Sequence, residues 1–158
     1  MQKNINGATF AKMVIAASKL LEVNRELIDS LNVFPVPDGD TGTNMSLTMQ
    51  SAIKELRACK SNSLHDLADS ISRGALKGAR GNSGVITSQI FRGMCAILKD
   101  KQDFDTKFFA KALKNAIRQA IAVVDTGITY DIAKEAKIFE AKRLAEIEAK
   151  HAEEAKNE

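Results

Sequence analysis

The segment from Asn32 to Asn44, NVFPVPDGDTGTN, constrains the fold more than any other part of the chain. It holds both prolines of the protein and two of its nine glycines. Proline fixes φ and lacks an N–H, and glycine readily adopts positive φ, so this segment cannot continue a helix. Apolar residues with helical periodicity stand on both sides of it. We therefore expect a shaped loop between two helices.

Two carboxylates lie close together in this loop, because only Gly39 separates Asp38 from Asp40. Like charges at such a turn repel unless a cation lies between them or one of them binds a proton. Mg²⁺ is commonly held by one or two carboxylates and by substrate phosphates. A helix that begins near Asn44 would direct its free N–H groups at the same place. The pattern indicates a metal and phosphate site, and an ordinary structured turn remains the alternative.

A second cluster of glycines, GALKGARGNSG, spans residues 74–84. Glycine destabilises a helix by roughly 1 kcal/mol relative to alanine, so four glycines in this stretch need a geometric reason. Close approach of the backbone to a ligand is one reason, and a tight corner between helices is another. The helix that follows, with Ile86, Ile90 and Ile97 on one face, would present its first N–H groups and the Ser83 hydroxyl to a phosphate.

Neither motif matches the common ion or nucleotide loops. A calcium loop starting at Asp38 requires glycine at its sixth position and glutamate at its twelfth, where this chain has Thr43 and Met49. The glycine cluster lacks the spacing and the lysine of a P-loop, and no strand precedes it as a dinucleotide fingerprint requires.

Composition indicates one globular domain without export or membrane signals. The chain has 158 residues, 44% hydrophobic and 27% charged, with a net charge of +3. No apolar run approaches the roughly 20 residues that span a bilayer, and there is no apolar signal segment at the start. We therefore expect a cytoplasmic protein with Cys59 and Cys95 as reduced thiols. The weak, unclustered basic charge suits a nucleotide and argues against nucleic acid.

Helical periodicity dominates the first 125 residues, and no convincing strand alternation is present. We predict an all-α, mostly antiparallel helical bundle. Helices are expected around Phe10–Leu21 and Asn24–Leu31, and after Asn44. Ser63-Leu-His-Asp66 has the pattern of a capping box, with Asp in place of Glu, and should open the fourth helix. Asp105 or Thr106 should cap the sixth.

The two motifs together resemble the ATP-binding DhaL-like domain shared by dihydroxyacetone kinases and bacterial fatty acid kinases. The resemblance rests on LNVFPVPDGDTGTNM at residues 31–45 and GARGNSGVI at residues 78–86, and it covers roughly residues 5–125. The lead-in NVFPVP is more similar to the fatty acid kinase branch. The resemblance implies a barrel-like arrangement of about six to eight helices, with the nucleotide at one end. It also implies ATP-dependent phosphoryl transfer to an oxygen nucleophile, most specifically a fatty acid carboxylate presented by a separate lipid-binding protein.

The resemblance also implies roles for individual residues. Asp38 and Asp40 are the expected catalytic residues and Mg²⁺ ligands, with Asn32 as the candidate third ligand and two ions expected. The expected nucleotide contacts come from both motifs: Thr41, Gly42, Thr43, Asn44, Met45, Arg80, Gly81, Asn82, Ser83 and Gly84.

The chain departs from the family after the sixth helix. The family's Pro-Val-Glu-Gly-Thr-like turn is replaced at residues 124–129, where only Gly127 is clearly retained. We expect a nucleotide-binding domain over residues 1–128 and a charged helical tail over 129–158, so the C-terminal part is shortened or divergent. Three further readings stay open: a nucleotide-binding subunit of a split kinase without turnover, a glycerone kinase subunit, and a purely structural helical module. A homodimer is also open.

Overall fold

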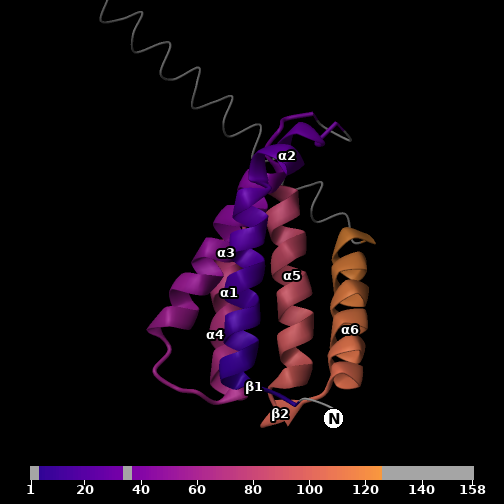
Figure 1. Cartoon of the computed structure of the whole chain (residues 1–158). Helices are drawn as coiled ribbons and strands as arrows, with labels where there is room; N and C mark the ends of the chain where they lie inside the picture. Colours follow the sequence, from indigo (N-terminus) through magenta and orange to yellow (C-terminus); the bar gives the residue numbers. More distant parts are fainter. Residues whose placement is uncertain (1–3, 34–36, 126–158) are drawn as a thin grey trace, which may run out of the picture.

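The computed structural model describes residues 4–33 and 37–125. Six helices and two very short strands make up this part of the chain (Figure 1). In chain order the elements are β1 (Ile5–Asn6), α1 (Gly7–Val23), α2 (Arg25–Ser30), α3 (Thr41–Ala58), α4 (Leu64–Lys77), α5 (Gly81–Leu98), β2 (Asp103–Phe104) and α6 (Thr106–Asp125). The predicted all-α class is confirmed.

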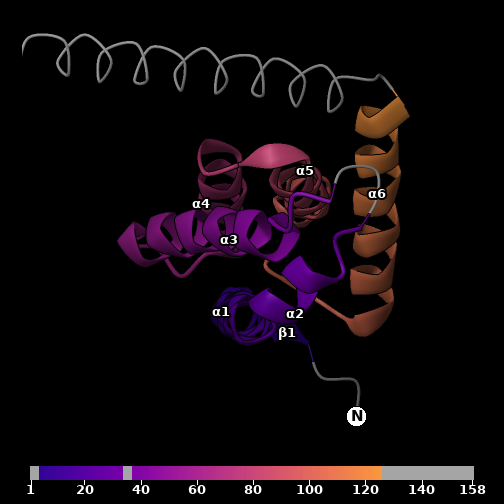
Figure 2. The same cartoon turned by 90° about the horizontal axis from the view of Figure 1, so that it is seen from above.

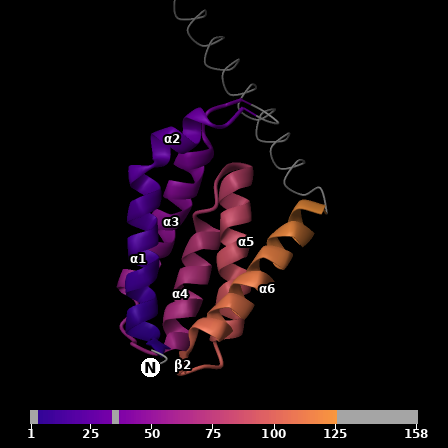
Figure 3. The same cartoon turned by 45° about the vertical axis from the view of Figure 1, so that its right-hand side comes forward.

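The long helices form an antiparallel bundle, with α6 packed against α5 at one side (Figures 2 and 3). The core lies between α1, α3, α4 and α5, and its largest fully buried side chains include Phe10, Leu64, Ile71 and Leu98. Small residues let helices approach closely: a Cβ on Gly93 of α5 would lie 2.8 Å from Ala116 Cα of α6. The periodic apolar residues therefore form core, as their spacing predicts.

A two-stranded antiparallel sheet joins the beginnings of α1 and α6. Ile5 pairs with Phe104 and Asn6 with Asp103, at the end of the bundle opposite α2 (Figure 1). Phe104 of this sheet meets the Phe10 ring of α1 edge to face, with centroids 5.9 Å apart. Strands of two residues show no alternation, so the sequence pattern did not predict this sheet.

Two predicted helix caps are confirmed. The Ser63 hydroxyl accepts a hydrogen bond from the Asp66 amide at 3.1 Å, and Asp105 Oδ1 accepts one from the Phe108 amide at 2.7 Å. The Ser63 amide itself donates to Ser61 Oγ, so the return bond of a full capping box is absent here. The fourth and sixth helices therefore begin where the cap-forming residues indicate.

Two helices begin before the apolar residues that mark them. α3 starts at Thr41 rather than near Asn44, and α5 starts at Gly81, ahead of Ile86, the first apolar residue named in its pattern. The first turn of each helix lies at the end of the bundle and needs no apolar side chain, so periodicity cannot locate it. Both glycine-containing motifs consequently supply first turns of helices.

Some predictions fall outside the described residues. These are the Phe34–Val36 part of the loop, the altered turn after Asp125 and the charged tail at 129–158. Within the described part, no helix is both long and apolar enough to cross a membrane. Cys59 and Cys95 are both free thiols, and burial raises the pKa of Cys95 to about 12.

Candidate nucleotide and metal site

The acidic loop draws its polar side chains together at the start of α3. Asn32 Nδ2 donates to Asp38 Oδ1 at 2.5 Å, across the loop. Gly39 has φ of +65°, a value that glycine adopts without strain, and it allows the chain to turn between the two carboxylates. Asp40 is the N-cap residue of α3, and its carbonyl accepts from the Asn44 amide at 2.8 Å. The structure thus brings the three expected metal ligands into one loop.

The pKa of Asp40 is raised by this arrangement. Desolvation is the largest cause that raises its pKa above the ordinary value, and the neighbouring carboxylates of Asp38 and Asp29 raise it further. A hydrogen bond with the Asn44 side chain acts in the opposite direction. Like charges that raise a carboxyl pKa are an arrangement that a cation would relieve.

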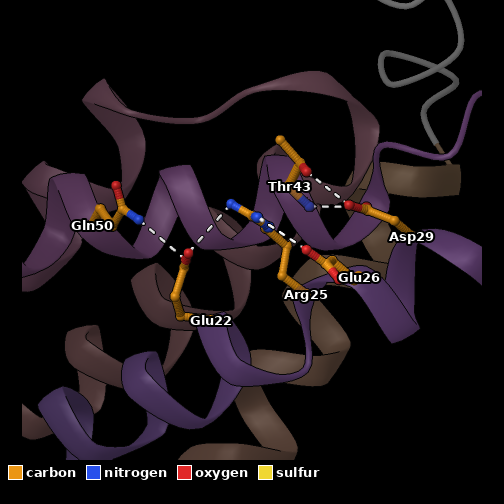
Figure 4. A network of polar contacts seen from close by, with 6 residues as sticks. All are labelled: Glu22, Arg25, Glu26, Asp29, Thr43 and Gln50. Atoms are coloured by element: carbon orange, nitrogen blue, oxygen red, sulfur yellow. Dashed lines mark hydrogen bonds and ion pairs between the residues drawn. The ribbon is translucent and has the colours of Figure 1, made fainter.

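Asp29, which lies in α2, takes part in this site although no motif pointed to it. Its Oδ1 accepts from the Thr43 amide at 3.0 Å and its Oδ2 from the Thr43 hydroxyl at 2.7 Å (Figure 4). Desolvation acts to raise the pKa of Asp29, but hydrogen bonds from Thr43 and the Gly42 amide, with the charge of Arg25, lower it overall. Asp29 therefore remains ionised and fixes the first turn of α3.

The same side of the junction between α1, which holds Glu22, and α2 continues this network toward α3. Glu22 Oε1 lies 3.3 Å from Arg25 Nη1, and Glu22 Oε2 accepts from Gln50 Nε2 at 3.1 Å (Figure 4). Gly42 allows α2 to lie directly on α3, because a Cβ at that position would collide with the Arg25 carbonyl oxygen. Polar contacts and a glycine thus hold α2 over the start of α3.

The glycine motif lies against the first turns of α3. The Ser83 hydroxyl donates to the Thr41 carbonyl at 3.4 Å. Gly81 has φ of +56°, and a Cβ on it would collide with the Asn44 side-chain amide. A Cβ on Gly84 would lie 2.5 Å from Thr48 Oγ1. The two motifs are therefore in direct contact, through residues 42 positions apart in the sequence.

The helices differ in how their first turns are satisfied. Asn6 and Ser63 accept hydrogen bonds through their side chains from the first turns of α1 and α4. At the start of α3 the N-cap residue Asp40 makes no such bond, but the Asp29 carboxylate of α2 accepts from the Gly42 and Thr43 amides instead. At the start of α5 the N-cap residue Arg80 makes none. The first turn of α5 therefore leaves N–H donors for another acceptor, and an anion is a suitable one.

The remaining expected contact residues lie around these first turns. Asn82 Oδ1 is buried and has no hydrogen-bond donor among the described residues. Arg80 is exposed, and Met45 is half-buried in α3. An unpaired buried polar atom costs free energy unless a ligand or water satisfies it. Asn82 Oδ1 is therefore a buried acceptor in the glycine motif, which a hydrogen-bond donor or a cation of a bound ligand would satisfy.

The donor set fits a magnesium ion that is shared with phosphates rather than one held by protein alone. No group of three or more Asp, Glu, His or Cys residues within the described ranges is arranged to hold a metal. Mg²⁺ usually takes only one or two carboxylates and fills its other positions with water and substrate phosphates. Asp38 and Asp40 match that smaller requirement.

Sequence comparison identifies the family. The family model described as the DAK2 domain matches residues 35–155, which is more than half of the chain. The chain therefore belongs to the DAK2 family, a branch of the dihydroxyacetone kinase superfamily of ATP-using kinases. The matched stretch runs past residue 128, where the sequence pattern predicts that the nucleotide-binding domain ends.

The chain is similar to longer bacterial proteins whose names state no activity. Uncharacterized proteins of Staphylococcus aureus strains USA300, NCTC 8325 and N315 are each 45% identical to it over 124 residues. This alignment covers 78% of the chain but 23% of each relative. The chain thus spans about a quarter of the length of these relatives.

Proposed function

We propose that this chain binds Mg·ATP at the joined motifs and transfers the γ-phosphoryl group to a fatty acid carboxylate, which a separate lipid-binding protein presents. The contact between the Ser83 hydroxyl and the Thr41 carbonyl carries this proposal, because it joins the glycine motif to the acidic loop. Carboxylates for a metal and free amides for phosphates then lie side by side. Membership in a kinase superfamily supports the same reading.

Asp38 and Asp40 are the proposed magnesium ligands, with Asn32 beside them. Asn32 donates to Asp38 through its amide nitrogen, which leaves its carbonyl oxygen as the metal-binding atom. Bound Mg²⁺, for which we propose two ions, supplies positive charge that offsets the charge of the triphosphate and of the two carboxylates.

Thr43 is proposed to act through its hydroxyl oxygen. Its hydroxyl proton and its amide proton are both directed at Asp29, so neither is available to donate to a phosphate. The oxygen lone pairs are then free to face a cation. Asp29 is the proposed positioning residue that fixes this orientation.

The first turn of α5 is the proposed phosphate-binding segment. Its residues are Gly81, Asn82, Ser83 and Gly84, and Arg80 precedes them. The Gly84 amide already donates to the Arg80 carbonyl at 3.0 Å, so the amides before it are the proposed donors. Thr41, Gly42, Asn44 and Met45 would line the facing side from α3. Fixed amide dipoles of this kind stabilise phosphoryl transfer chiefly by position and charge.

The proposed reaction needs no general base. The bond between the γ-phosphorus and the oxygen that bridges to the β-phosphate breaks, and a carboxylate oxygen of the fatty acid forms the new bond to phosphorus. The products are an acyl phosphate and ADP. A carboxylate has no proton to lose at neutral pH. Among the described residues we accordingly assign no acid–base role.

A transfer assay tests the proposal. The purified chain is incubated with Mg·ATP and a lipid-binding protein loaded with fatty acid, and ADP release and acyl phosphate are measured. We expect ADP release only when acceptor and carrier are both present, and none with Asp38→Asn. A parallel reaction with dihydroxyacetone tests a glycerone-type acceptor, and turnover there alone would replace the fatty acid in this proposal.

Nucleotide binding without turnover would favour a different member of the same class. If the chain binds Mg·ATP with every carrier and acceptor tested but never consumes it, it is the nucleotide-binding subunit of a split kinase. The chain matches only about a quarter of each relative, which is consistent both with a chain that transfers phosphate itself and with one that only binds the nucleotide. Absence of nucleotide binding would leave only a structural helical module.

A further inference from the structure

The outer side of the α1–α2 junction is apolar and exposed. Leu20, Val23, Leu27, Leu31 and Val33 are between 59% and 82% exposed. Large apolar side chains that gather on a surface commonly mark a site of interaction, whereas isolated ones need no explanation. Together these five residues are called the α2 patch below.

The end of α1 and the whole of α2 expose apolar residues on the side away from the bundle. Leu20, Val23, Leu27 and Leu31 follow at intervals of three and four residues, which place side chains on one side of a helix. The hydrogen bonds from Asn24 N to Leu20 O and from Ile28 N to Asn24 O continue this spacing across the break between α1 and α2. The apolar side is therefore continuous along the junction.

The opposite side of the junction is polar and faces α3. Glu22 bonds to Gln50 and Asp29 bonds to Thr43, both on α3 (Figure 4). A helix on the surface of a globular domain normally buries its apolar side and exposes its polar side. Here that arrangement is reversed. Packing within the described residues therefore does not explain why these exposed positions are apolar.

Charge indicates which kind of partner suits the α2 patch. Residues 19–33 and 37–40 contain five carboxylates and two cations, and one of the cations, Arg25, is paired with Glu22 and Glu26. An acidic surrounding repels anionic membranes, nucleic acids and a second copy of the same patch. It favours an apolar protein surface rimmed by lysine and arginine.

α6 offers a contrasting face on the same molecule. Its apolar residues Leu113, Ile117, Ile121 and Val124 are also exposed, but residues 106–124 carry four cations and no carboxylate. The two faces share hydrophobic character and differ in charge. They therefore serve as internal controls for each other.

We infer that the α2 patch is the docking surface for a partner protein whose contact surface is apolar and basic-rimmed. Its role rests on the proposed function: the patch ends at Val33, one residue after Asn32 of the acidic loop, so a partner docked there would bring its phosphoryl acceptor to the metal ligands. Complementary charge would set the orientation of the partner, and burial of the leucines would supply affinity.

Two designed peptides test the docking surface without the natural partner. One is an amphipathic helix of about 18 leucine and lysine residues, or five helical turns, and the other has glutamate in place of lysine. Each is titrated into the ¹⁵N-labelled chain and followed by NMR. We expect the leucine–lysine peptide to shift amides of residues 20–33 and the leucine–glutamate peptide to leave them unchanged.

Matched variants locate the binding. Leu27→Ser combined with Leu31→Ser should weaken the leucine–lysine peptide about tenfold or more. Leu113→Ser combined with Ile117→Ser on α6 should leave its affinity unchanged. Both double variants should bind Mg·ATP as the original chain does, which separates loss of docking from failure of the nucleotide site.

Three results would overturn the inference. The first is peptide binding that shifts residues on α6 or elsewhere but spares residues 20–33. The second is binding that the Leu27 and Leu31 changes do not weaken. The third is self-association of the chain, in sedimentation velocity experiments, that these same changes abolish, because the α2 patch would then be occupied by a second copy.

Discussion

Asp29 holds Thr43 with both oxygens of its carboxylate, one on the amide at 3.0 Å and one on the hydroxyl at 2.7 Å. This pair fixes α2 to the first turn of α3, at the point where the acidic loop ends. The geometry of the proposed metal ligands therefore depends on a residue outside both sequence motifs.

Replacing Asp29 with Asn should destabilise the chain by about 1 kcal/mol at pH 7, since hydrogen bonds to a charged acceptor are lost at a site that solvent partly screens. The folded pKa of Asp29 is lowered from 3.8. Its contribution is therefore present above that value and is lost as the pH falls through the folded pKa. Urea denaturation at pH 7 and pH 3 checks both statements.

The control for this change is Glu26→Gln, also on α2, whose side chain is 92% exposed. It should alter the free energy of unfolding by less than about 0.5 kcal/mol. A difference between Asp29→Asn and the original chain that persists unchanged at pH 3 would contradict the assignment of an ionised Asp29.

Asp40→Asn should stabilise the chain in the absence of metal and nucleotide. Because the folded pKa of Asp40 is raised, the folded state binds its proton more tightly than the unfolded chain does. Stability therefore falls as the pH rises from the pKa of Asp40 in the unfolded chain through its higher pKa in the folded chain. Asn is neutral at every pH, so the variant does not lose this stability. We expect a Tm about 2 °C higher at pH 7. Thermal unfolding with a metal chelator measures it.

The same variant should respond less to ligand. Mg²⁺ with an ATP analogue should raise the Tm of the original chain and not that of Asp40→Asn. An equal rise in both proteins would show that Asp40 does not hold the metal.

Gly81→Ala should weaken nucleotide binding about tenfold or more and destabilise the fold by about 2 kcal/mol. Its backbone has φ of +56°, and the new Cβ would push the Asn44 side chain aside. Gly39→Ala is a matched comparison, since φ there is +65° but the nearest atom to a Cβ is 3.9 Å away. It should cost about 1 kcal/mol of backbone strain alone. Equal stability losses, measured in urea, would contradict the contact between Gly81 and Asn44.

Gly93→Ala should destabilise the fold without affecting the nucleotide site. Its Cβ would lie 2.8 Å from Ala116 Cα, a backbone contact that only a shift of α6 relieves. Overpacking of this kind costs about 1 to 3 kcal/mol. Denaturation measures this loss, and unchanged affinity for Mg·ATP analogue would show that the effect is confined to the α5–α6 contact.

The sequence predicts most of the fold because the helices bury regular apolar stripes and several caps are local. Ser63 and Asp105 illustrate this, since each acts within three residues of its own position. The β1–β2 pairing is different: it joins Asn6 to Asp103 through two-residue strands, which leave no periodic signal. Long-range pairing of such short segments requires the assembled bundle.

The site is only partly predictable for a related reason. The residues of the acidic loop and the glycine motif are conspicuous because prolines, glycines and carboxylates cluster there. Asp29 bonds to a residue 14 positions away and has no motif of its own. A signal does exist at α2: Leu27 and Leu31 are four residues apart, as are Arg25 and Asp29, so each pair lies on one side of the helix. Periodicity shows the two sides but not which one faces the bundle.

Calorimetric titration of Mg²⁺ with a non-hydrolysable ATP analogue into the chain tests the central claim most directly. We predict binding of one nucleotide per chain that requires Mg²⁺ and is lost in Asp38→Asn combined with Asp40→Asn. Heat no greater than buffer dilution with the original chain, or equal affinity in the double variant, would contradict a nucleotide–metal site at the joined motifs.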